Sequence, residues 1–210
     1  PAFSIWSVIY LGLAAYVVWQ WMPANAVTER TRRTGWLIAL SMLLNATWLL
    51  VTQQGWIWAS VVVIALLMVV LGRILVGLAG RPARSTAERV VVDGTFGLYA
   101  GWVAVATCAN VTAALVDSGV ELPGAAGEWV GVLVLGVAVA VAALLAHRVG
   151  GRLAVAAAMA WGLAWIAIGR LTDQPASTVV GVAASAAALA VVTLTVVARI
   201  RRARPSLGSS

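Results

Sequence analysis

The sequence contains no lysine, and all 14 of its basic residues are arginine. A retinal-type Schiff base needs a lysine amine, so that class of membrane protein is excluded. Exclusive use of arginine, together with abundant alanine, valine and glycine, is typical of a high-GC coding bias. We therefore expect a bacterial protein.

Cysteine and histidine are almost absent as well. Cys108 and His147 each stand alone, so no intrachain disulfide can form and no cluster of metal ligands is visible. The sequence also offers no acid–base pair and no activated nucleophile. These absences predict no metal and no obligatory cofactor, and they favour a non-enzymatic role while leaving that question open.

Charge is scarce: charged residues make up 10% of the 210 residues, and hydrophobic residues make up 62%. Soluble domains carry about 25% charged residues, so the composition predicts an integral membrane protein in contact with the lipid bilayer. The net charge of +7 does not indicate a nucleic-acid partner, because the arginines gather between long apolar runs.

Seven apolar runs are long enough to cross roughly 30 Å of hydrocarbon as helices, which predicts an all-α fold. They cover residues 3–22, 36–53, 56–78, 90–116, 129–147, 153–169 and 177–198. Residues 117–128 are predicted to form an outer loop, and residues 199–210 a disordered basic tail. Asp93, near the start of the fourth run, is expected to cap that helix.

The arginines are divided unevenly between the two ends of this predicted bundle. Alternate connections, together with the C-terminal tail, hold 13 arginines on one side, whereas the other side holds Arg170 alone. The positive-inside rule places the arginine-rich side in the cytoplasm. The chain is therefore expected to start outside and to end inside the cytoplasmic membrane of a bacterium.

Polar and aromatic side chains recur at helical spacing within three of the runs. They are Tyr99, Trp102, Ala106 and Asn110; Phe3, Trp6 and Tyr10; and Asn45 with Trp48. Hydrocarbon offers no hydrogen bonds, so such groups must face a partner, a cavity or a ligand. For Asn45 and Asn110, a hydrogen bond between helices and a place in a pocket wall are equally supported. For the tryptophans a pocket wall is favoured, because an indole is bulky for close helix packing yet stacks well on flat π-systems.

These segments resemble motifs of the tryptophan-rich sensory protein family, which includes the mitochondrial translocator protein (TspO/MBR). The stretch from Phe3 to Tyr10 is similar to the family's second helix, and Leu44-Asn45-Ala-Thr-Trp48 to its third. Gln53-Gln54-Gly55-Trp56 resembles the start of the fourth helix, and Tyr99 to Asn110 resembles the fifth. Leu98 departs from the pattern, because the family has a proline there.

The resemblance covers residues 1–116 and implies a pocket for tetrapyrroles and other flat hydrophobic ligands, often in a homodimer. The family's first helix is expected upstream of Pro1, and residues 129–198 would add three helices, as in a longer bacterial subgroup. Trp161 and Trp165 are expected to pack within those added helices. The predicted ligand-binding residues are Trp6, Tyr10, Asn45, Trp48, Trp56, Tyr99, Trp102, Ala106 and Asn110. We expect the first four helices of this chain to enclose the pocket.

The leading functional interpretation is a membrane receptor or sensor that binds a flat hydrophobic ligand such as a porphyrin. A transporter of such molecules is a second possibility, although intramembrane charges and broken helices, which transporters commonly carry, are not evident. A porphyrin photo-oxidising enzyme is a third, and its chemistry would rely on the ligand's own photochemistry and a nearby indole.

The predicted orientation can be tested by cysteine labelling in a chain whose Cys108 has been replaced. A membrane-impermeant thiol reagent added from outside should label a cysteine at Glu121 and leave a cysteine at Arg84 unlabelled. Labelling of the cysteine at Arg84 but not of the one at Glu121 would show that the predicted orientation is wrong.

Overall fold

A computed structural model describes residues 1–26, 28–120, 124–173 and 176–203. The predicted loop at residues 117–128 and the predicted disordered tail at 199–210 therefore lie partly outside the described residues. Within the described residues, 125–128 and 199–203 differ from these predictions because they are helical. Within the described part, seven helices are long and apolar enough to cross a membrane, which confirms the all-α membrane fold expected from the sequence.

The helices extend beyond the apolar runs at several ends. They are α1 (Ile5–Trp21, preceded by η1, Ala2–Ser4), α2 (Pro23–Ala26), α3 (Glu29–Gln53), α4 (Ile57–Ala79), α5 (Thr86–Glu88), η2 (Arg89–Gly94), α6 (Thr95–Asp117), α7 (Ala125–Val149), α8 (Leu153–Thr172) and α9 (Thr178–Ala203). Helix α3 begins about two turns before the predicted run at 36, because Thr28 caps it by accepting from the backbone N–H of Thr31 at 3.1 Å.

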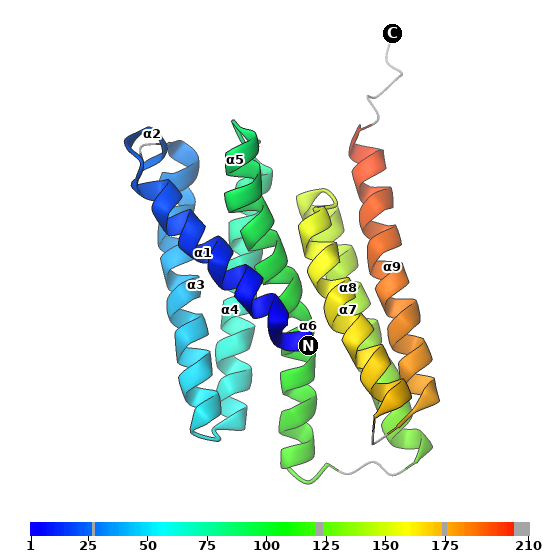
Figure 1. Cartoon of the computed structure of the whole chain (residues 1–210). Coiled ribbons are helices and arrows are strands. Elements are labelled where there is room, and N and C mark those ends of the chain that lie inside the picture. Colours follow the sequence, from blue (N-terminus) through cyan, green and yellow to red (C-terminus); the bar gives the residue numbers. More distant parts are fainter. Residues whose placement is uncertain (27, 121–123, 174–175, 204–210) are drawn as a thin grey trace.

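The arginine-rich connections gather at one end of the bundle, the upper end in Figure 1. Helices α2 and α5, the turn between α7 and α8 and the C-terminal end of α9 lie there, and the tight turn between α3 and α4 lies at the opposite end. This arrangement agrees with the alternation of arginines along the chain. The positive-inside rule predicts that the upper end faces the cytoplasm, and we name it the cytoplasmic end after this prediction.

Helix α6 occupies the centre of the molecule. Helices α3 and α4 pair beside it, and α8 packs on its other side together with α7 and α9. Helix α1 crosses the bundle diagonally and contacts both α6 and η2, while η1 reaches α8 (Figure 1). The last three helices therefore join the first four mainly through the contact between α6 and α8.

Two glycines one turn apart on α6 make that contact possible. A Cβ added to Gly97 would lie 2.7 Å from the Cβ of Ala154, and one added to Gly101 would collide with the carbonyl oxygen of Val155. Small residues four apart are the usual means of close approach between helices in membranes. The backbone of α8 therefore rests directly on α6, and the space between them has no room for a larger side chain.

The substitution Gly101→Ala should destabilise the protein by about 1–3 kcal/mol, because the added methyl group meets rigid backbone and α8 must shift. Thermal unfolding in detergent would measure this loss. Gly136→Ala is the matched control, because a Cβ on Gly136 meets no described atom within 4 Å. Equal stability of the two variants would show that α6 and α8 are not tightly packed.

Candidate functional site

The three polar-aromatic stripes meet around the ring of Trp6. Its ring centroid lies 5.2 Å from that of Tyr10, 6.0 Å from Tyr99, 6.2 Å from Trp102 and 6.3 Å from Trp48. These distances fall within the 4.5–7 Å range that favours aromatic pairs. Helices α1, α3 and α6 thus contribute to one aromatic cluster, which fixes the position of α1 against the bundle.

Several polar groups of the stripes bind helices to one another. The side-chain amide of Asn45 donates to the hydroxyl of Tyr10 at 3.1 Å, and this bond joins α3 to α1. The hydroxyl of Tyr99 donates to the backbone carbonyl of Ser41 at 3.2 Å, joining α6 to α3. Of the two roles considered for Asn45 from the sequence, the geometry gives it the interhelical hydrogen bond.

A cavity of about 400 Å³ adjoins this cluster on the side of α8. Trp48, Trp102, Ala106 and Asn110 line it from the predicted set. Its other walls come from η1, α6 and α8, through Ala2, Phe3, Val105, Ala109, Ala113, Gly162, Trp165 and Ile166. The cavity therefore differs from the expectation that the first four helices alone enclose it, because α8 supplies one wall.

Two residues of this cavity wall carry an indole N–H group that has no hydrogen-bond partner in the described part of the chain. They are Trp48 and Trp102, and both nitrogen atoms are buried. A buried donor without a partner costs about 1–3 kcal/mol, so its presence calls for an explanation. Asn110 also borders the cavity, but its amide is engaged: it donates to the hydroxyl of Ser60 at 2.9 Å and ties α6 to α4.

The remaining predicted residues lie away from the cavity wall. Trp6, Tyr10, Asn45 and Tyr99 form the cluster behind it. Trp56 stands just before α4 with 63% of its surface exposed, and it lines none of the cavities described here. Its position fits an interfacial tryptophan at the outer rim.

Trp165 lies at this site, although its sequence pattern predicted only packing within the three added helices. It lines the cavity of Trp48 and Trp102 and also a second, outer cavity of about 780 Å³ between α6, α7 and α8. Val105, Ala109, Ala113 and Ile166 are likewise shared by the two cavities, so these adjoin. The one-turn spacing of Trp161 and Trp165 indicated that the two side chains lie on one helix face. It gave no indication that this helix, α8, packs on α6.

A protein-family model described as TSPO-like protein matches residues 1–197. The chain belongs to the TSPO-like family. The membership confirms the resemblance seen in the four motifs, and the matched region also runs through α7, α8 and most of α9. Comparison with curated proteins and with solved structures gave no match. At the level of the family, the protein is a membrane sensor or receptor of hydrophobic ligands.

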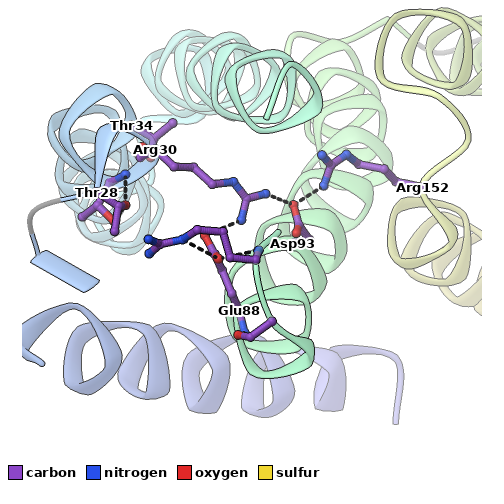
Figure 2. A network of polar contacts seen from close by, with 9 residues as sticks. Thr28, Arg30, Thr34, Glu88, Asp93 and Arg152 are labelled. Carbon is purple, nitrogen blue, oxygen red and sulfur yellow. Dashed lines mark hydrogen bonds and ion pairs between the residues drawn. The ribbon is translucent and has the colours of Figure 1, made fainter. Parts of the chain in front are cut away.

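The cytoplasmic end of this TSPO-like protein holds a buried ionic network (Figure 2). The guanidinium of Arg30 on α3 lies between two carboxylates, 2.9 Å from Glu88 and 2.5 Å from Asp93. Arg152, just before α8, reaches the same oxygen of Asp93 at 2.5 Å. Only 6% of Arg30 and 2% of Glu88 are exposed. The network therefore links α3, η2 and α8 below the surface.

A wide helical turn places the two carboxylates side by side. Residues five apart on an α-helix point about 140° away from each other, yet Glu88 and Asp93 both face Arg30. The segment between them, η2, is a π-helix, whose wider turn brings the two side chains toward one face. Asp93 is thus not the helix cap that the sequence predicted; that role falls to Ser85, whose hydroxyl accepts from the backbone N–H of Glu88 at 3.1 Å.

Replacing Asp93 with asparagine should destabilise the protein by about 3–5 kcal/mol, because two arginines lose the carboxylate that they share. Unfolding followed by circular dichroism in detergent would measure the effect. Glu29→Gln is the control: Glu29 also pairs with two arginines, but its side chain is 61% exposed, so a loss below about 1 kcal/mol is expected. Similar losses for both variants would contradict a buried, stabilising network.

Proposed function

We propose that the protein is a receptor or sensor in a bacterial cytoplasmic membrane, and that it binds a flat hydrophobic ligand of the tetrapyrrole class. The ligand would occupy the cavity bordered by Trp48, Trp102 and Trp165. The observation that carries this proposal is the pair of unpartnered indole N–H groups of Trp48 and Trp102 at the cavity wall. Both nitrogen atoms are buried in the structure without ligand, so a ligand with hydrogen-bond acceptors would satisfy these donors once the indole rings turn toward it.

The chemistry of the cavity fits such a ligand. Indole rings offer flat faces for stacking on a macrocycle, and the small residues Ala106, Ala109 and Gly162 leave room beside them. A volume of about 400 Å³ lies within the range of small-molecule sites, and the adjoining outer cavity extends the available space. A mostly apolar wall with a few placed donors is the usual composition of a binding site for a hydrophobic molecule.

The transporter alternative gains no support from the arrangement of charges. Known transporters commonly place charged residues or broken helices near the middle of the membrane. Here the buried ionic network and the π-helical turn lie at the cytoplasmic end of the helices. A homodimer, which the family resemblance implies, stays a prediction.

Substitution of the cavity tryptophans should weaken porphyrin binding. Stacking of a base on an aromatic ring, used as an analogy, contributes ~1–3 kcal/mol per ring, and about 1.4 kcal/mol corresponds to tenfold in affinity. Trp48→Ala or Trp102→Ala should therefore raise the Kd for porphyrin about five- to hundredfold. Porphyrin absorbance and quenching of tryptophan fluorescence would both report it.

The phenylalanine variants isolate the role of the N–H groups. Trp48→Phe and Trp102→Phe keep a ring but remove the donor, so about two- to tenfold weaker binding is expected from one lost hydrogen bond. Trp129→Ala serves as the control, because Trp129 is exposed and outside both cavities. If porphyrin binds the protein no more tightly than it binds empty detergent micelles, the receptor proposal is wrong. The family membership would then support only a shared fold.

A further inference from the structure

A second kind of cavity, of about 540 Å³, lies at the cytoplasmic end and shares no lining residue with the two apolar ones. Four arginines border it: Arg30 from α3, Arg89 from η2, Arg152 before α8 and Arg199 from α9. Asp93 is the carboxylate on its wall, and Glu88 lies behind it on Arg30. The residues around this cavity therefore carry an excess of positive charge.

The donors around this cavity are not all engaged. Among the described residues, Arg89 and Arg199 form no ion pair. Within the described ranges, the Nε atoms of Arg30 and Arg152 are buried and have no hydrogen-bond partner. Both residues line the cavity, and Arg30 is 94% buried. Each guanidinium carries five donors, so the internal carboxylates satisfy only part of them.

The fold holds these arginines together through the tight turn between α7 and α8. Gly150 and Gly151 have φ of +81° and +67°, a left-handed conformation that other residues rarely adopt. A Cβ on Gly151 would collide with the carbonyl oxygen of Thr195 and lie 2.8 Å from the backbone nitrogen of Arg199. The turn therefore rests directly on α9, which brings Arg199 next to Arg152.

We propose that this arginine-lined cavity is a binding site for a phosphate group. Arginine presents paired donors that match phosphate oxygens, and an anion here would meet the guanidinium groups of Arg89 and Arg199, which form no ion pair with the described residues. Leu78, Leu153 and Ala154 form an apolar part of the wall, at the end of the spans where lipid headgroups lie. Basic pockets between helices on the cytoplasmic side are a common way to hold anionic lipids.

Two sources could supply the phosphate group: the headgroup of an anionic phospholipid or a soluble phosphate. The positive charge at this end also sets the orientation of the protein in the membrane. Orientation, however, requires only exposed arginines such as Arg32 and Arg201. It does not require the burial of Arg30, nor a cavity beside it. Arg89 and Arg199 are exposed as well, but they line the cavity, so a comparison of these two with arginines outside the cavity separates a site from a general attraction.

The test titrates the whole protein, in neutral detergent at physiological ionic strength, with phosphatidylglycerol and counts bound lipid by native mass spectrometry. Diacylglycerol with the same chains is the lipid that lacks phosphate. The cavity variant Arg89→Gln/Arg199→Gln leaves the ionic network intact and should bind phosphatidylglycerol about ten- to thirtyfold more weakly. The matched variant Arg32→Gln/Arg201→Gln removes the same charge from exposed positions outside the cavity and should change affinity about twofold or less, because salt screens distant charges.

Competition with inorganic phosphate identifies the source. Displacement of phosphatidylglycerol by inorganic phosphate would support a site for soluble phosphates, and binding of phosphatidylglycerol that resists competition would support a lipid site. Equal losses in the two double variants would overturn the proposal, as would binding of diacylglycerol as tight as that of phosphatidylglycerol. Failure of the wild type to bind either phosphatidylglycerol or inorganic phosphate would overturn it as well.

Discussion

The close contact between α6 and α8 is the constraint on which the rest of this structure depends. Gly97 and Gly101 let the backbone of α8 lie against α6. Because of that approach, Gly162 and Trp165 of α8 reach the cavity that Trp48 and Trp102 border. The same contact carries Arg152, at the start of α8, to Asp93 on η2. A looser pairing would open the cavity and separate the charges.

The two ends of the molecule have different chemistry. The cavities along the lower part of α6 have mostly apolar walls, and the larger of the two is also lined by Asp117, Arg170 and Asp173. The cytoplasmic end combines four arginines with a π-helical turn that gathers two carboxylates around Arg30. Buried charges in a membrane protein cost free energy unless they are paired, and intramembrane charges commonly have a functional role. Both the hydrophobic ligand and the phosphate group that we propose follow from this separation.

The polar residues inside the membrane divide into two groups. Asn45, Tyr99 and Asn110 make hydrogen bonds between neighbouring helices and stabilise the bundle. The indole nitrogens of Trp48 and Trp102 make none, although they lie in the same aromatic region. Hydrocarbon supplies no partner for an N–H group. Trp48 and Trp102 belong both to the aromatic cluster and to the cavity wall, and the buried Oδ1 of Asn45 in the cluster also has no partner among the described residues. The cavity beside the two tryptophans, rather than the cluster itself, provides the space for a ligand.

The sequence by itself determined the seven spans, the alternation of arginines and the aromatic stripes, because apolar length, loop charge and helical spacing are local properties. It also identified Trp48, Trp102, Ala106 and Asn110, which lie on the cavity wall. The tertiary structure decided the rest. Whether Asn45 binds Tyr10 or a ligand depends on how α1 crosses α3, and the part played by Trp165 depends on which helix α8 meets. The pairing of Asp93 with Arg30 and Arg152 joins residues about 60 positions apart through a wide turn that no local pattern announces, since contacts between distant segments are fixed by packing.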